Sequence, residues 1–271
     1  MSFFRIDLCY MKNAVIIFMF TLGIFLSGCA TREYNTATGK EDIMFVGTDK
    51  EVNIGKSIAQ SIEKSKEIKL DPDPLMTERV DKVGQKIASV SDRKEVKYTF
   101  RVIDKDDVNA FALPGGYVYV FKGLVDKISN DDELAAVIAH EIAHVVARHS
   151  VKRLQGSVGY DILRILMAVT GAGSGDAGRI DAAFGQLIMS YSREDEALAD
   201  KLAVKYLKEA GYDPWAVVSL LKKLQESNKI APIRTYTSYR SHPYVADRIR
   251  MVKQELGGEV DFNDYMNKAI E

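Results

Sequence analysis

The sequence has 271 residues, of which 46% are hydrophobic and 28% are charged, and this composition suits one globular domain. Its 37 basic and 38 acidic residues are mixed along the chain, so the net charge is −1 and a nucleic-acid partner is not expected. The two cysteines, Cys9 and Cys29, lie near the N-terminus, which excludes a disulfide framework for the rest of the chain.

Residues 1–28 have the pattern of a secretory signal peptide. Lys12 precedes an uncharged run, Ala14–Leu26, that is shorter than the roughly 20 residues of a membrane span. The run leads into Leu26-Ser27-Gly28-Cys29, which resembles a bacterial lipobox, whose cysteine becomes the lipidated first residue of the mature protein. We therefore expect a lipoprotein that is anchored to a bacterial envelope membrane through Cys29.

The same segment leaves alternatives open. A plain signal peptide cleaved near Ala30, or an uncleaved anchor, also fits the pattern, and both Met1 and Met11 fit as the start of translation. No aspartate follows Cys29, which in Gram-negative bacteria favours the outer membrane, with the protein facing the periplasm.

The domain organisation follows from these boundaries. We expect residues 29–45 to form a lipid-anchored tether that includes a strand leading into the domain. Residues 46–256 are expected to form that domain, and residues 257–271 a C-terminal tail.

The first half of the domain combines helices with a small sheet. Helical spacing of apolar residues appears in Glu51–Lys64, and again after the helix-start signal at 71–74 as far as about Val90. One face of this second helix is expected to carry Leu75, Val80, Val83 and Ile87. Three β-rich segments follow, namely Tyr98–Ile103, Val108–Leu113 and Tyr117–Phe121. These elements predict a mainly helical α+β fold with an antiparallel or mixed sheet of about three strands.

A buried helix is predicted from Asp131 towards Ser150. Asn130 can cap it, and Glu133 stands three residues later, as in a capping box. The helix body is apolar on nearly all sides, so it is expected in the domain centre. Its C-terminal end is expected to be more exposed, because it carries Arg148, His149, Lys152 and Arg153.

This helix contains the sequence His140-Glu141-Ile142-Ala143-His144. Four residues turn a helix by about 400°, so the two imidazoles stack on one face about 6 Å apart and can grip one divalent metal such as zinc. Glu141 projects from the same turn, where it could act as general base toward a water at the metal. His149 is nine residues from His140, about 180° round the helix, so it is expected to point away as a structural or exposed residue.

Two segments follow before the next strong helix. Residues 160–169 predict an apolar helix that is too short to span a bilayer. The glycine-rich residues 171–178 lack the Gly-Lys-Ser/Thr ending of a phosphate loop and are interpreted as a flexible connection. A mobile flap near the active site is the alternative.

Glu196 and Asp200 share one face of a helix that is predicted to begin near Tyr191 and to end at about Ala210. Carboxylates on a buried face are costly unless they are paired or bound to metal. The helical pattern therefore leaves two interpretations, a metal-facing pair or a solvated acidic face with Arg193 as local partner.

Four motifs in order resemble one family. They are the segment from Asn109 to Gly116, HEIAH, the SREDEALAD segment with Glu196, and Ser241-His242-Pro243 with Arg248. Together they resemble the HtpX-type zinc metallopeptidases, gluzincins that include the CAAX prenyl proteases and periplasmic lipoprotein proteases of the BepA and LoiP kind. The resemblance covers residues 45–255 and implies a zincin-type domain with one Zn²⁺ per chain.

The resemblance also implies roles for single residues. Glu196 would be the third zinc ligand after His140 and His144, and Asp200 a partner that orients a ligand histidine. The strand at Asn109, Ala110 and Phe111 would border the cleft and pair with extended substrate. His242 would lie close to the metal, either as an oxyanion donor or as a cap on the zinc at rest, and Arg248 would hold that segment.

The expected function is a membrane-anchored zinc endopeptidase that hydrolyses misfolded or unassembled envelope proteins. The alternatives are a chaperone-like or binding lipoprotein with a closed zinc site, and a processing protease dedicated to one substrate. The sequence leaves the oligomeric state, the physiological substrate and the cleavage preference open.

Overall fold

The computed structural model describes residues 31–44, 46–65, 68–156, 191–230, 241–261 and 264. The signal peptide, Cys29, the helix expected at 160–169 and the glycine-rich segment at 171–178 lie outside these ranges. Within them, no helix combines the length and the hydropathy needed to cross a membrane.

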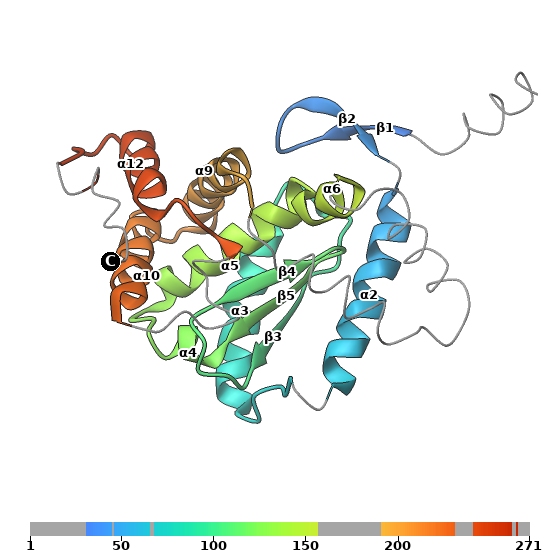
Figure 1. Ribbon diagram of the computed structural model, residues 1–271, viewed down its shortest axis with the longest axis horizontal. Helices are drawn as coiled ribbons and strands as arrows, with labels where there is room; N and C mark the ends of the chain where they lie inside the picture. Colours follow the sequence, from blue (N-terminus) through green and yellow to red (C-terminus); the bar gives the residue numbers. More distant parts are fainter. Residues whose placement is uncertain are drawn as a thin grey trace, which may run out of the picture.

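The α+β class expected from the sequence is confirmed (Figure 1). The strands form a hairpin, β1 and β2, and a separate group, β3 to β5; the described helices are α2 to α6, α9, α10 and α12. Their bounds are β1 Thr31–Asn35, β2 Lys40–Met44, α2 Thr48–Lys64, α3 Pro74–Val90, β3 Thr99–Ile103, β4 Ala110–Leu113, β5 Tyr117–Phe121, α4 Lys122–Val125, α5 Asp131–Val146, α6 His149–Gly156, α9 Arg193–Ala210, α10 Ala216–Ile230 and α12 Val245–Glu255.

The central sheet has the strand order β3-β5-β4, in which β3 runs parallel and β4 antiparallel to β5. Side chains alternate between two faces along each strand, so Ala110 and Ala112 belong to the core with α3 and α5, whereas Phe111 and Leu113 belong to the core with α2 and α6. The sheet is therefore covered on both faces, as Figure 1 shows with α2 on one side and α3 and α5 on the other. Among the described strands, β4 is an edge of this sheet and lies beside α5.

Helix boundaries follow the local capping chemistry. The Asp73 side chain accepts from the amide of Leu75 at the start of α3, and Ser192 and Asp195 form a capping box at the start of α9. Gly211 ends α9 in the left-handed conformation, with φ of +73°. At α5 the Asn130 side chain accepts from the Glu133 amide at 3.0 Å, as expected.

Three sequence predictions are wrong in detail. The Glu133 carboxylate accepts from the Ser129 amide and binds Lys223 on α10, so it does not close the predicted capping box on Asn130. Leu75 is 73% exposed because it lies in the first turn of α3, before the helix reaches the sheet at Val80.

The third error concerns the end of the HEIAH helix, where Arg148 and His149 are buried and not exposed. The helix stops at Val146, and Arg148 takes a left-handed backbone with φ of +58° before α6 begins. The Arg148 guanidinium donates to Glu33 and to the Val46 carbonyl and forms an ion pair with Glu51 at 2.9 Å. These buried contacts explain why a non-glycine residue is held in this conformation.

The β1–β2 hairpin contacts the junction between α5 and α6. Besides the Glu33–Arg148 pair, Lys152 lies 2.6 Å from Asp42, and the Asn35 side chain donates to the Ala147 carbonyl at 3.3 Å. The strand expected in the tether is thus one arm of a hairpin that docks beside the HEIAH helix.

Candidate active site

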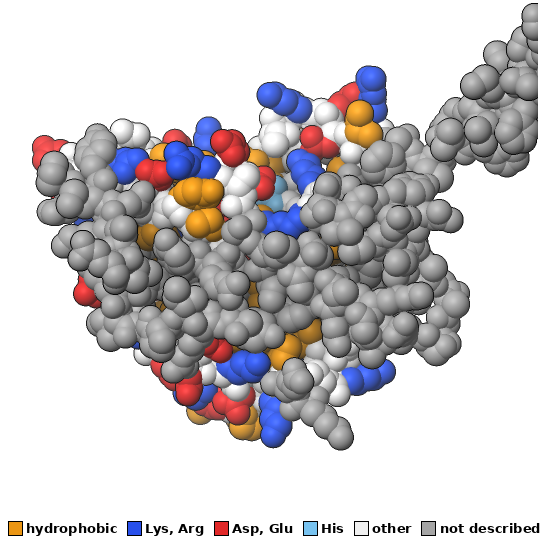
Figure 2. All heavy atoms as spheres, viewed as in Figure 1, with side chains coloured by type: hydrophobic (Ala, Val, Ile, Leu, Met, Phe, Trp, Pro, Cys, Tyr) orange, Lys and Arg blue, Asp and Glu red, His pale blue; other side chains and the backbone are white. Residues whose placement is uncertain are grey.

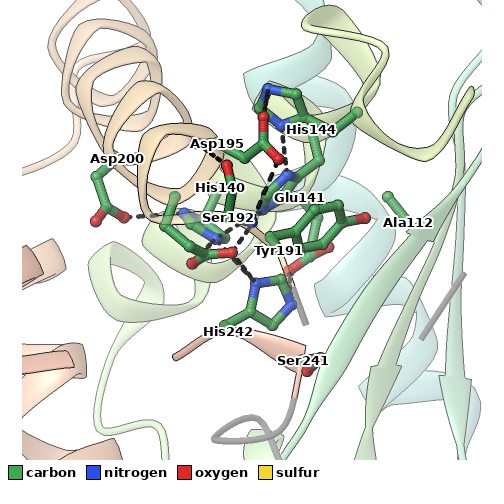
Figure 3. Close-up of polar contacts among 12 residues, drawn as sticks. Ala112, His140, Glu141, His144, Tyr191, Ser192, Asp195, Asp200, Ser241 and His242 are labelled. Atoms are coloured by element: carbon green, nitrogen blue, oxygen red, sulfur yellow. Dashed lines mark hydrogen bonds and ion pairs between the residues drawn. The ribbon is translucent and has the colours of Figure 1, made fainter. Parts of the chain in front are cut away.

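The HEIAH side chains lie where α5 packs against α9. Ala199 and Ala203 of α9 are fully buried, and such small residues let the two helices approach closely. His140, Glu141 and His144 are at most 7% exposed, and Figure 3 shows them turned toward His242. Residues far apart in the sequence thus converge on one buried point.

Four side chains meet there with ligand atoms within 4.8 Å of one another, namely those of His140, His144, Glu196 and His242. The Nε2 atoms of His140 and His144 are 3.1 Å apart, and Glu196 Oε1 lies 3.6 Å from His144 Nε2. Ligands of a tetrahedral zinc at roughly 2.0–2.1 Å would be about 3.3 Å from one another. The spacing and the nitrogen and carboxylate donors therefore fit zinc.

The charge balance of the site also fits a divalent cation. Three carboxylates, those of Glu141, Glu196 and Asp200, are at most 2% exposed, and the guanidinium of Arg248 is the permanent cation buried among them. The net charge of this group is −2 when the histidines are neutral, and isolated buried charge is strongly unfavourable. A dication would neutralise the group.

The protonation states follow from the same contacts. Burial lowers the pKa of His144 well below 6.5, and although burial opposes ionisation of Glu196, the Arg248 charge holds the pKa of that carboxyl well below 4.5. Both groups thus have the form that metal ligands need. Burial and Arg248 oppose the charged form of His140, but hydrogen bonds with Asp200 and Glu196 outweigh them and raise its pKa to about 9. A metal would have to displace that proton.

Asp200 and Arg248 hold the side chains of the cluster in position. Asp200 Oδ1 lies 2.9 Å from His140 Nδ1, which leaves Nε2 of that ring facing the other ligands. Arg248 on α12 donates to both oxygens of Asp200 at 2.7 and 2.8 Å and lies 2.8 Å from Glu196 Oε2. The family resemblance implied that Arg248 supports the metal site and holds the His242 segment, and its guanidinium contacts two of the site carboxylates directly.

Glu141 and His242 lie on the open side of the cluster. His242 Nδ1 is 3.0 Å from Glu196 Oε1 and 3.3 Å from His140 Nε2, so this atom stands where a fourth ligand would stand. His242 Nε2 is 3.5 Å from Glu141 Oε1, whereas Glu141 Oε2 is buried without a hydrogen bond to any residue that the structure describes. That oxygen is available to accept a proton from water.

Asn109 connects the segment that contains Ser241 and His242 to the edge strand β4. Asn109 accepts through Oδ1 from the Ala110 amide and from Ser241 Oγ, while its carbonyl accepts from the Phe121 amide. Phe111 points to the opposite face of the sheet, where its ring stacks on Tyr119 with 5.1 Å between centroids. Of the three residues expected to border the cleft, Asn109 and Ala110 thus lie beside the site, and the Phe111 side chain does not.

A pocket opens beside Glu141 and His140. Ala110, Asp200, Arg248 and His242 also line it, and its remaining walls are apolar. They are built from Leu124, Ala136, Val137, Val217, Leu220, Leu221 and Leu224.

Sequence reasoning missed His149, Asp195 and Tyr191. The Tyr191 ring stacks on His144 with 3.9 Å between centroids, and the Tyr191 amide donates to the Ser241 carbonyl, which places the His242 segment beside α9. Burial raises the pKa of Tyr191 to about 12, so its hydroxyl stays neutral. Its position directly before the capped start of α9 was visible in the sequence, but its contact with His144 was not.

Comparison with known proteins agrees with this geometry. The model of peptidase family M48 matches residues 74–256. Mitochondrial metalloendopeptidase OMA1 of Schizosaccharomyces pombe is 33% identical over 178 residues, 65% of this chain and 52% of the relative. Beta-barrel assembly-enhancing protease of Escherichia coli K12 is 28% identical over 190 residues, 65% and 38% of the two chains.

Metalloprotease LoiP of Escherichia coli K12 is 29% identical over 163 residues, 59% of this chain and 63% of the relative. The chain thus spans less than two thirds of the length of each of these three relatives. The family match extends over most of the sequence and includes α5, α9 and α12, which carry the buried cluster. The chain therefore belongs to peptidase family M48, and the resemblance predicted from its four motifs is confirmed.

Proposed function

We propose that the protein is a zinc-dependent endopeptidase of the bacterial envelope. The observation that carries the proposal is the buried set of His140, His144 and Glu196 with Glu141 beside it, which has the donors and the charge for one Zn²⁺. Two imidazoles and one carboxylate are the protein ligands of catalytic zinc in peptidases, where the fourth position serves water or substrate.

Zinc bound there would polarise the scissile carbonyl and lower the pKa of a water molecule toward about 7. Glu141 would take the proton of that water through Oε2, which no described residue bonds, and pass it to the leaving amine. Asp200 and Arg248 would fix His140 and Glu196 in place during this transfer.

Substrate is proposed to bind along β4. The Asn109 carbonyl is bonded to β5, so by the alternation of an antiparallel pair the main chains of Ala110 and Ala112 face away from β5. On that side the Ala110 amide donates to Asn109 Oδ1 and the Ala112 carbonyl accepts from Ser150 Oγ, so the Ala110 carbonyl and the Ala112 amide are the groups that a substrate strand would bind. An extended peptide could pair with this edge in a manner that depends little on its sequence. Phe111 would then fix the strand to the core and would not contact substrate.

The apolar pocket beside Glu141 explains why the proposed peptidase would act on unfolded chains. Its walls from α5 and α10 suit a large apolar side chain. Such side chains are buried in folded proteins and become accessible when a protein is misfolded or unassembled. Binding in the pocket would therefore select damaged substrates without a separate recognition domain.

The name of one bacterial relative, beta-barrel assembly-enhancing protease, suits a location in the envelope. With the lipobox-like segment at Cys29, we propose a lipoprotein held at the outer membrane and facing the periplasm, where it removes misfolded envelope proteins. A protease dedicated to one substrate is the narrower alternative.

A second candidate function rests on His242. Because its Nδ1 stands at the fourth ligand position, the zinc site would be closed in this arrangement, as in a chaperone-like or binding lipoprotein. The buried, unbonded Oε2 of Glu141 favours the peptidase, since a purely structural zinc site has no use for a base.

The test is digestion of casein by the zinc-loaded protein, with a tightly folded protein of similar size as comparison. The proposal predicts that casein is cleaved, that a zinc chelator stops cleavage, and that Glu141→Gln is inactive while it still holds zinc. Casein left intact by a zinc-loaded protein would contradict the peptidase and favour the closed site.

A further inference from the structure

His149, which the helical spacing placed on the far side, is in contact with a proposed zinc ligand. Its ring is 3% exposed, and its Nδ1 lies 2.8 Å from Nδ1 of His144. Its other nitrogen, Nε2, lies 3.2 Å from Oδ1 of Asp195. The two ring nitrogens of His149 are thus both engaged, one by His144 and one by a carboxylate of α9.

The backbone break between α5 and α6 makes this contact. In a continuous helix His149 would lie about 180° from His140. The left-handed turn at Arg148 instead starts α6 at His149 and brings the ring back to His144. Since the guanidinium of Arg148 is held by Glu33 and Glu51, the turn is fixed by the hairpin and by α2.

Only one arrangement of protons satisfies every atom of this chain of contacts when His144 uses Nε2 for the metal. Its Nδ1 must then carry the proton and donate to Nδ1 of His149. His149, accepting through Nδ1, carries its own proton on Nε2 and donates to the Asp195 carboxylate.

The contact between His149 and His144 is the counterpart of the contact between Asp200 and His140. Asp200 bonds His140 directly at 2.9 Å, and Asp195 bonds His144 through His149. Both carboxylates lie on α9, on either side of Glu196 in the sequence. One helix would therefore supply the third ligand and the orientation of the other two.

We propose that His149 and Asp195 are positioning residues that hold His144 with Nε2 turned toward the metal. The proposal rests on the zinc site put forward above, but it concerns metal affinity and ring geometry, and cleavage of substrate does not enter it. Partners of this kind typically contribute 10–100-fold to metal affinity.

The test compares zinc affinities measured by competition with a chromophoric chelator. His149→Leu fills the same space without an acceptor and is expected to bind zinc 10–100-fold more weakly. His149→Asn places an amide oxygen near the position of Nδ1 and is expected to restore most of that affinity. Val151→Ala is the control on α6, since it removes buried apolar contacts with no polar contact to the site.

Asp195 is tested in the same way against a control in its own capping box. Asp195→Ala is expected to weaken zinc binding several-fold, because the Nε2 proton of His149 loses its acceptor. Ser192→Ala removes the other half of the box and destabilises the start of α9, but it leaves His149 in contact with Asp195. Its zinc affinity is expected to equal that of the wild type.

Nitrogen NMR of the zinc-loaded protein gives a second readout that a merely structural role would not move. The wild type should show His144 protonated at Nδ1 and His149 at Nε2. The opposite tautomer of His149 would overturn the proposal. Equal zinc affinities of His149→Leu and the wild type would also overturn it. So would a loss of zinc affinity in Val151→Ala as large as that in His149→Leu. If His149→Leu does not fold, Asp195→Ala against Ser192→Ala decides, and equal affinities of those two contradict the role. A wild type that holds one zinc but leaves casein intact would refute the peptidase alone.

Discussion

Glu141→Gln is predicted to raise the stability of the zinc-free protein while it removes activity. The Glu141 side chain is 2% exposed, its Oε2 has no hydrogen bond among the described residues, and its Oε1 lies 3.5 Å from His242 Nε2. The carboxylate is thus a buried charge whose Oε2 is stabilised by no described donor. A neutral side chain of the same shape lowers the cost of burying this group.

The size of the effect follows from the cost of a buried group without partners. That cost is about 1–3 kcal/mol, and 1 kcal/mol shifts the melting temperature by roughly 2–4 °C in a domain of this size. We therefore expect the variant to melt roughly 2–12 °C higher than the wild type after zinc removal. Loss of the general base should lower kcat by about 10²–10⁴.

The assay is calorimetry of the zinc-free proteins together with casein digestion of the zinc-loaded ones. Glu133→Gln is the matched control, because it makes the same change on the same helix at a carboxylate that is bonded to Ser129 and Lys223. It should lose about 1.5–3 kcal/mol. A Glu141→Gln protein that is less stable than the wild type would refute the electrostatic reasoning, and one that keeps full activity would remove Glu141 from the mechanism.

Three further predictions concern His242, the apolar pocket and the pH dependence of stability. His242→Ala should raise kcat/KM toward casein if the ring caps the metal, whereas a fall of about 10²–10³ in kcat would assign it to the oxyanion. Leu220→Trp should fill the pocket and lower kcat/KM by about 10–200-fold for peptides with a large apolar residue at the cleavage site, measured against peptides with alanine there. Although burial opposes ionisation of Glu133, its bonds with Lys223 and Ser129 lower its pKa below 4.5. Its stabilisation is thus complete above about pH 4.5 and is lost as the pH falls further, so acid unfolding curves of the wild type and Glu133→Gln should converge there; curves that stay parallel would contradict this.

The sequence predicted the local elements well because their signals are local. Helical spacing and a turn signal located α2 and α3, and the strand segments located β3 to β5 within two residues. The capping residue Asn130 placed the start of α5 for the same reason, and the helical pattern placed the start of α9 near Tyr191. Glu196 could be proposed as a ligand only through the family resemblance, since helical spacing alone also allowed a solvated face.

What the sequence could not predict depends on contacts between distant segments. The break at Arg148 requires Glu33 and Glu51, which lie about a hundred residues earlier, and without that break His149 points away from His144. Glu133 departs from its capping box because Lys223 of α10 lies within reach. Such long-range ion pairs leave no periodic signal in the sequence.

The most direct test of the proposed zinc centre is the metal content and zinc affinity of the wild type and of Glu196→Ala. The buried cluster predicts one zinc per chain in the wild type and loss of the metal in Glu196→Ala, because the third ligand is removed. A wild type without stoichiometric zinc, or a Glu196→Ala protein with unchanged zinc content, would contradict the assignment of His140, His144 and Glu196 as the zinc ligands.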